Sequence, residues 1–182
     1  IVKYWGKRNK DLILPLNSSL SVAMDTNDLC TVTTATSSVV PEGETPVIQM
    51  YVNGEQEQVT DRIHRIILDL QSRATMLYVY ATEPYSLNSK SWEKRSLTIR
   101  SHNTFPTAAG LASSASGMSS LVLSLAQLFG VKELFKNEMS TFARQLSGSA
   151  SRSCRGGFVK WNMGELNTGL DSKAEFCYPA EH

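Results

Sequence analysis

The segment that most constrains the fold is residues 105–117, FPTAAGLASSASG, together with the apolar stripe that follows it. Its Gly, Ala and Ser residues carry little or no side chain, so they let the backbone approach a ligand closely. The stripe comprises Met118, Leu121, Val122, Leu125, Leu128 and Phe129. This helical spacing, ending at Gly130, predicts a tight loop that runs directly into the N-terminus of a helix.

Such a loop is suited to an anion, because unpaired N–H groups and the helix dipole favour negative charge there. The small residues of the loop would let its backbone N–H groups approach a ligand closely. Ser113 and Ser114 would cap the helix or offer hydroxyls to a phosphate. No Gly-Lys-Ser/Thr follows, so the segment is not a Walker A loop. Helix capping with small residues for close packing would produce the same pattern, and the residues alone leave both readings open.

Two further segments suit an anion. Residues 3–8, KYWGKR, place three cations around two aromatic residues and a glycine, which offers point charges and a phenolic hydroxyl. Residues 147–153, SGSASRS, place Arg152 among four serines, and a guanidinium with hydroxyls around it suits the many oxygens of a diphosphate. The alternatives are a solvated turn with an aromatic anchor and a flexible linker with an incidental arginine.

The remaining segments mix strands and helices without strict alternation. Strands are predicted at 20–24, 29–34, 47–52, 97–102 and 158–163, helices at 60–73, 118–129 and 138–145, and loops at 36–46, 83–96 and 147–153. Thr60 suits a helix N-cap, and Asn53-Gly54 is a strong hairpin signal. This order predicts an α+β fold with a mixed sheet packed on helices.

Composition narrows the class of protein. Of the 182 residues, 41% are hydrophobic and 19% charged, and the net charge is +1, which fits a soluble globular chain with no overall attraction to nucleic acid or acidic membranes. No apolar run is long enough to span a bilayer. Three cysteines without close pairing favour reduced thiols, so a cytoplasmic location is expected.

Four segments in the same order resemble the mevalonate diphosphate decarboxylases of the GHMP kinase superfamily. They are KYWGKR (3–8), LPLNSSLS (14–21), FPTAAGLASSASG (105–117) and SGSASRS with the GGFVKW that follows (147–161). VNGE at 52–55, followed by a helix carrying Arg62, is also similar. The resemblance implies that residues 1–182 are a ribosomal-protein-like βαβ N-terminal domain, incomplete at both ends and without its C-terminal domain.

The resemblance also implies a reaction. Members bind mevalonate 5-diphosphate with ATP and Mg²⁺, phosphorylate the 3-hydroxyl, and lose phosphate and CO₂ to give isopentenyl diphosphate for isoprenoid and sterol biosynthesis. They act on a small molecule without nucleic acid or membrane, and a homodimer is expected. No metal ligands from the protein are expected in this segment.

By position, the resemblance assigns roles to individual residues. The substrate-binding residues would be Tyr4, Trp5, Gly6, Lys7, Arg62, Ser147, Gly148, Ser149, Ala150, Ser151 and Arg152. The ATP-binding residues would be Gly110, Leu111, Ala112, Ser113 and Ser114. Arg152, Ser114 and Lys7 would support catalysis, with Arg152 paired to the substrate carboxylate or its neighbouring phosphate. The family's catalytic aspartate lies beyond these residues, so this segment alone is expected to be inactive and to expose apolar surface.

Two positions depart from the family pattern, and two rival functions stay open. Ser151 stands where the family usually has cysteine, which is a small polar exchange. Arg155 stands where the family usually has an aromatic residue, which changes the packing or adds a cation near the substrate. The rivals are a mevalonate or phosphomevalonate kinase of the same superfamily and an inactive diphosphate-binding fragment.

Overall fold

The computed structural model describes residues 3–74, 89–106 and 113–179. They fall into two compact units, each described here by itself. The first unit comprises Ile1–Thr31, Asn103–Ser120 and Glu133–His182, and the second comprises Val32–His102 and Leu121–Lys132. The prediction that residues 1–182 are a single N-terminal domain stays a prediction.

The second unit is built on a four-stranded sheet. Its strands, in spatial order, are β4 (Thr31–Val39), β7 (Arg95–Asn103), β5 (Ile48–Val52) and β6 (Glu55–Glu57). β5 runs parallel to β7 and antiparallel to β6. Asn53 and Gly54 connect β5 to β6 with positive φ angles of 52° and 91°, as a two-residue type I′ turn requires. The hairpin predicted from this dipeptide is therefore confirmed.

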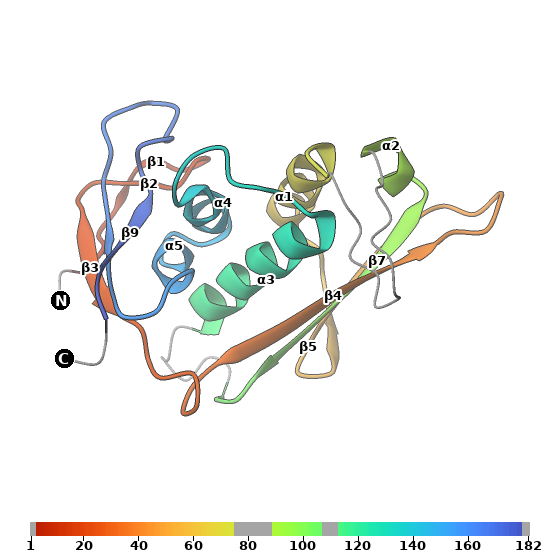
Figure 1. Cartoon of the computed structure of the whole chain (residues 1–182), viewed down its shortest axis with the longest axis horizontal. Coiled ribbons are helices and arrows are strands. Elements are labelled where there is room, and N and C mark those ends of the chain that lie inside the picture. Colours follow the sequence, from red (N-terminus) through yellow and green to blue (C-terminus); the bar gives the residue numbers. More distant parts are fainter. Residues whose placement is uncertain (1–2, 75–88, 107–112, 180–182) are drawn as a thin grey trace. The chain divides into compact units, whose positions relative to one another are not determined.

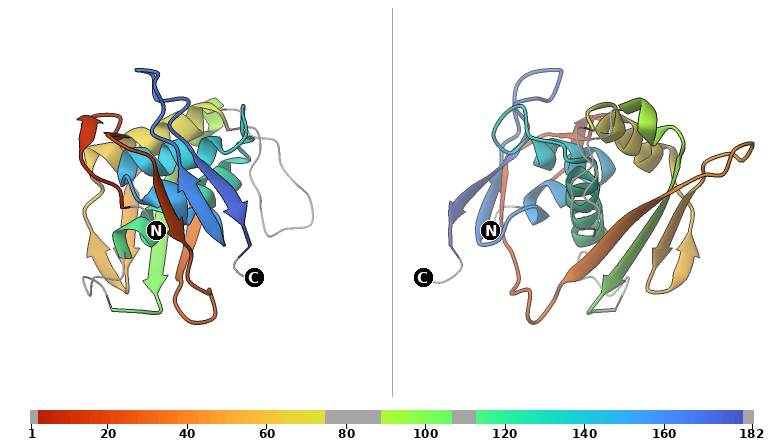
Figure 2. Two further views of the ribbon diagram at one scale, coloured as in Figure 1. Left: turned by 90° about the vertical axis from the view of Figure 1, so that its left-hand side faces the viewer. Right: turned by 45° about the vertical axis from the view of Figure 1, so that its right-hand side comes forward.

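Helix α1 (Asp61–Ser72) and the second half of α3 (Ser113–Phe129) lie on one face of this sheet (Figures 1 and 2). The Thr60 hydroxyl accepts a hydrogen bond from the Ile63 N–H at 3.4 Å, which confirms the predicted N-cap. The apolar face of α1 is buried and consists of Ile63, Ile66, Ile67 and Leu70. Helix α3 ends before Gly130, whose φ of 64° suits a residue without a side chain.

The first unit is built on a three-stranded antiparallel sheet of β3 (Ser19–Val22), β8 (Phe158–Trp161) and β9 (Ala174–Tyr178), with β8 in the centre. The short hairpin of β1 (Lys7–Asn9) and β2 (Leu14–Pro15) precedes it. Helices α4 (Glu138–Leu146) and α5 (Ala150–Ser153) lie on one face of the sheet (Figure 1). Val159, Trp161 and Ala174 form a buried core against which Tyr4 packs.

The structure corrects several predicted boundaries. β4 continues to Val39, so the loop predicted from residue 36 begins too early, because uncharged Thr and Ser residues extend the ladder opposite β7. Residues 150–153 form α5 rather than loop, and β9 was not predicted.

The loop predicted at 83–96 is also wrong in its described part. Residues 83–88 lie outside the described residues, but Ser89–Trp92 form the short helix α2. Trp92 is only 1% exposed and packs edge-on against Phe129, with ring centroids 4.6 Å apart. A single tryptophan among polar residues anchors this segment in the core.

The α+β class with mixed sheets packed on helices is confirmed. Within the described ranges, every helix is too short or too polar to cross a bilayer.

Candidate anion-binding site

Arg152 is the centre of a polar cluster in the first unit. Its guanidinium donates to two hydroxyls of β3, from Nε to Ser21 Oγ at 3.0 Å and from NH1 to Ser19 Oγ at 2.6 Å. Ser19 and Ser21 point to the same face of the strand because side chains alternate with a period of two. Both partners are neutral, so the arginine keeps its full charge and further N–H donors for an anion.

Two aromatic rings flank this guanidinium. The Trp161 ring centroid lies 5.8 Å from Arg152 Cζ, within the range of a cation–π contact. The Tyr4 and Trp161 rings pack with centroids 4.9 Å apart at 47°. The Tyr4 hydroxyl is buried and has no hydrogen-bond partner among the described residues. A buried hydroxyl without a hydrogen-bond partner costs free energy. A bound oxyanion would remove this cost by accepting a hydrogen bond from Tyr4.

The electrostatics of the cluster follow from this burial. Burial lowers the pKa of Arg152, and the neighbouring Tyr4 partly opposes that shift. Burial likewise raises the pKa of Tyr4, against the influence of Arg152. Tyr4 and Arg152 are therefore both partly desolvated, and no acidic residue of the described part of the unit compensates the charge of Arg152. A bound anion would offset the free-energy cost of burying this guanidinium.

The loop before Arg152 shapes the cluster. A Cβ at Gly148 would lie 3.1 Å from Ile13 Cγ2, 3.1 Å from Trp161 Cη2 and 3.3 Å from Tyr4 Cε1, so only glycine fits without displacement. The Ser151 hydroxyl donates to the Gly148 carbonyl at 2.8 Å, and both Ala150 and Ser151 are fully buried. Ser147 and Ser149 are half-buried at the ends of α4 and α5.

In the KYWGKR segment, some side chains are exposed to solvent and others fix the local backbone. Trp5 is 65% exposed, and the Lys3 ammonium lies 4.6 Å from its ring centroid. Gly6 has a φ of 58°, which favours glycine, and a Cβ there would displace the Leu16 side chain, whose Cδ1 would lie 2.5 Å away. Lys7 is exposed on β1.

Arg8 differs from the lysines beside it. Its NH2 group donates to the Gly164 and Leu166 carbonyls, both at 3.2 Å. Arg8 therefore fastens the loop before Asp171 through one of its nitrogens, whereas Lys3 and Lys7 lie exposed.

The start of α3 lies beside the end of α5. The Ser119 hydroxyl donates to Cys154 Sγ at 3.2 Å, which joins the second turn of α3 to the segment directly after Arg152. Ser113 begins the helix and Ser114 is exposed in its first turn. Gly110, Leu111 and Ala112 lie outside the described residues, so their predicted contact with phosphates stays a prediction.

Arg62 belongs to the second unit, on α1, and is half-buried. Because each unit is described by itself, its predicted place beside Arg152 stays a prediction. Conversely, Ser19, Ser21 and Trp161 were not among the residues predicted from the sequence. The available signal was the i, i+2 spacing of two serines within segment 14–21, which itself carries part of the resemblance.

Comparisons with known proteins place the chain in a family. The profile of the diphosphomevalonate decarboxylase-like N-terminal domain matches residues 1–174. The chain belongs to this family. A diphosphomevalonate decarboxylase of Candida albicans is 43% identical over 182 residues, which is 100% of this chain and 47% of that protein. The chain thus spans about half the length of the curated relatives it matches.

Solved structures of the decarboxylase family agree. The mevalonate diphosphate decarboxylase from Trypanosoma brucei is 34% identical, with a TM-score of 0.73 over 96% of this chain and 42% of that one. A structure of MDDEF in complex with MVAPP, AMPPCP and magnesium is 30% identical, with a TM-score of 0.67 over 97% of this chain and 47% of that one. The expected GHMP kinase-type fold is confirmed by these likenesses.

Proposed function

We propose that this chain supplies the substrate clamp and phosphate-binding helix of an ATP-dependent diphosphomevalonate decarboxylase. The reaction converts mevalonate 5-diphosphate and ATP to isopentenyl diphosphate, ADP, phosphate and CO₂. The observation that carries the proposal is Arg152, a desolvated guanidinium held by two hydroxyls and flanked by Trp161, within a chain of this family. Its free N–H donors suit a carboxylate or a phosphate.

Each predicted residue has a proposed task. Arg152 binds the substrate carboxylate or the adjacent phosphate, and the Tyr4 hydroxyl donates to the same anion. Lys7 and Arg62 neutralise the diphosphate, with Trp5 and Gly6 shaping the turn that carries Lys7. The residues of 147–151 hold the loop: the buried Ala150 and Ser151 fix its path, Gly148 leaves room for the Tyr4 and Trp161 rings, and Ser147 and Ser149 lie at its ends.

ATP and Mg²⁺ are proposed as cofactors, in keeping with the AMPPCP and magnesium of the related structure. A helix that begins with two serines offers N–H groups and hydroxyls that fit phosphate oxygens. The described residues contain no group of three or more His, Cys, Asp or Glu side chains that could hold a metal. ATP oxygens would hold Mg²⁺ when it is bound, and the Ser114 hydroxyl would be available to it. When bound, ATP supplies the phosphoryl group.

The roles of these residues are to position and neutralise, because phosphoryl transfer needs alignment and charge compensation more than covalent assistance. Arg152 keeps the carboxylate ionised and oriented until its carbon leaves as CO₂. The burial of the guanidinium strengthens this interaction, since fewer water molecules compete for the anion.

A coupled assay on the full-length protein tests the proposal. CO₂ and isopentenyl diphosphate must both form from mevalonate 5-diphosphate and ATP. A phosphorylated product that keeps its carboxyl group would instead assign a kinase of the same superfamily. Binding of both ligands without turnover would assign a non-catalytic receptor.

A further inference from the structure

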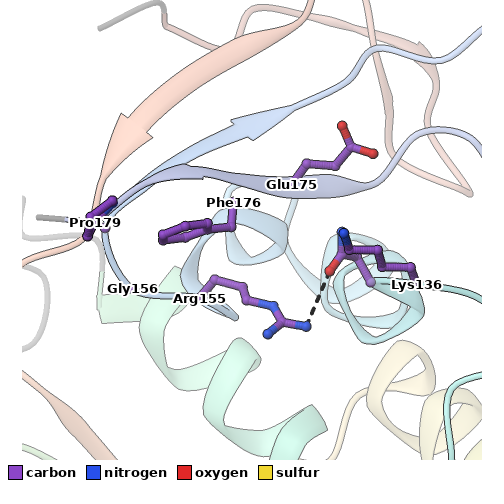
Figure 3. Close-up of a pocket in the computed structure, with 8 residues that line it drawn as sticks. Lys136, Arg155, Gly156, Glu175, Phe176 and Pro179 are labelled. Carbon is purple, nitrogen blue, oxygen red and sulfur yellow. Dashed lines mark hydrogen bonds between the residues drawn. The ribbon is translucent and has the colours of Figure 1, made fainter.

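A hollow lies in the first unit, lined in part by the segment that follows α5. Figure 3 shows it between the inner face of β9 and the turn that precedes α4. Its volume is about 850 Å³, and Arg155, Lys136 and Phe176 are among the residues that line it. None of the residues proposed above to bind the substrate or ATP is among them.

The charge in this hollow is not neutralised by its closest partner. Arg155 NH2 donates to Asn137 Oδ1 at 3.2 Å, and an amide oxygen carries no net charge. Arg155 is exposed, and the hydrogen bond given for its guanidinium goes to this neutral amide. Four of its five N–H donors are thus left for a ligand. Lys136 adds a second cation to the lining.

The nearby carboxylates are hydrogen-bonded to other donors. Glu133 accepts from the N–H groups of Asn137 and Met139, at 3.2 and 2.9 Å, at the start of α4. Glu175 accepts from Asn162 Nδ2 at 2.9 Å, and its carboxylate points away from Arg155 in Figure 3. These acids lower the local positive potential without using the donors of Arg155.

Phe176 and the Gly156–Gly157 segment form the uncharged part of the lining. Phe176 is 51% exposed although its strand neighbour Ala174 is buried, so its ring is available to a ligand. Gly157 has a φ of 74°, and a Cβ there would lie 2.4 Å from the Tyr178 carbonyl oxygen, which shows how closely β9 is pinned to the floor. A Cβ at Gly156, by contrast, would meet no atom within 4 Å.

We propose that this hollow binds an organic oxyanion with an apolar body, a phosphate or carboxylate carried on an aryl or alkyl group. The guanidinium of Arg155 forms paired hydrogen bonds with the oxyanion, and Lys136 adds charge at the rim. The Phe176 ring covers the apolar body. This site is independent of the decarboxylase reaction, so it stands or falls separately from the proposed function.

Calorimetric titration of the full-length protein with phenyl phosphate and with benzoate tests this proposal. Saturable binding of at least one of them is expected in the millimolar range, as suits a ligand of this size. The tighter of the two identifies the preferred head group. Inorganic phosphate is expected to bind at least about fivefold more weakly than phenyl phosphate, since it gains nothing from Phe176. Equal affinity would overturn the role of the apolar body.

Two variants locate the binding. Arg155→Gln keeps most of the side-chain size but removes the charge, and it should weaken binding about tenfold or more. Gly156→Leu places a larger apolar side chain on the lining and should weaken binding. It should not disturb the fold, because nothing lies within 4 Å of its new Cβ. Arg65→Gln, on an exposed position of α1, is the matched control and should change nothing.

Three results would overturn the proposal. They are unchanged affinity in both Arg155→Gln and Gly156→Leu, no saturable heat up to tens of millimolar ligand, and a crystal structure of the full-length protein with the hollow filled by another part of the chain. Unchanged thermal unfolding of each variant must accompany the titrations, so that loss of binding is not loss of fold. Decarboxylase turnover serves as a separate readout, and its absence would not affect this site.

Discussion

Arg144 and Arg152 lie within the same unit and are both withdrawn from water, but their partners differ. Arg144 is 1% exposed and donates to three backbone carbonyls, those of Leu12, Gly169 and Ser172. Burial, with a smaller contribution from Arg8, lowers its pKa to about 10, and Asp171 opposes the shift. Arg152 donates to two serine hydroxyls and keeps donors to spare.

The difference separates a structural arginine from a binding one. Arg144 donates its N–H groups to backbone carbonyls and so connects α4 with Leu12 and with the turn at 169–172. Hydroxyl groups orient Arg152 but leave its charge without a counter-ion. The two regions are also connected, because Arg144 holds the Leu12 carbonyl directly before Ile13, whose Cγ2 lies beside Gly148. Ile13 has a φ of 50°, an unusual value for a β-branched residue.

The largest expected effect is on stability. Arg144→Met should lower the free energy of unfolding by about 3 kcal/mol or more, because three buried carbonyls lose a charged donor. Urea unfolding followed by circular dichroism measures it. Arg65→Met, on the exposed face of α1, is the control and should change stability by less than about 0.5 kcal/mol. A cost for Arg144→Met no larger than that of the control would break the comparison.

Arg152→Ala should act on activity instead. In the full-length enzyme we expect kcat/KM to fall by about 2 kcal/mol or more in transition-state stabilisation, as for loss of a charged hydrogen-bonding partner. Steady-state kinetics with mevalonate 5-diphosphate measures it, alongside urea unfolding. A change below about threefold would count against the substrate role. If Arg152→Ala lowers the free energy of unfolding by more than it lowers transition-state stabilisation, then Arg152 has a structural role like that of Arg144.

The β3 hydroxyls should matter only through the arginine. Ser19→Ala and Ser21→Ala are each expected to lower kcat/KM by about 1 kcal/mol, since each removes one hydrogen bond that orients the guanidinium. A double-mutant cycle with Arg152→Ala isolates this coupling. The serine substitutions should have almost no further effect once Arg152 is absent. Additive effects would show that the serines act on the substrate directly.

The smallest effect is expected at Lys7. Lys7→Ala should raise KM for mevalonate 5-diphosphate by about twofold to threefold with kcat nearly unchanged, because an exposed ammonium contributes little per contact and Lys3 lies close by. The same change measured at high salt should be smaller still. A fall in kcat at constant KM would instead place Lys7 in the transition state.

Asp171 sharpens the structural side of the comparison. Its Oδ2 accepts from the Glu165 and Leu166 N–H groups at 2.7 and 3.1 Å. Although burial raises the pKa of this carboxyl, those hydrogen bonds and Arg8 lower it more, so its net pKa is below the usual value. A carboxylate whose oxygen accepts these backbone hydrogen bonds fixes the loop.

The sequence by itself determined the local elements and the likeness to a family. Helical spacing located α1, α3 and α4, Thr60 located a cap, and Asn53-Gly54 located a hairpin, because each of these depends on neighbours within a few residues. The order and content of the four segments indicated the resemblance to the decarboxylase family. Arg152 stood out because a single cation among small hydroxylated residues favours a loop that binds an oxyanion.

Only the tertiary structure decided which residues surround that cation. Ser19 and Ser21 lie more than 130 residues before Arg152 in the chain and meet it through the β3–β8 pairing. The split between Arg8, bonded to the loop at 164–166, and the exposed Lys7 beside it depends equally on distant carbonyls. Local pattern cannot reveal either result, since hydrogen-bond partners so far apart in the sequence are chosen by strand pairing and packing rather than by spacing along the chain.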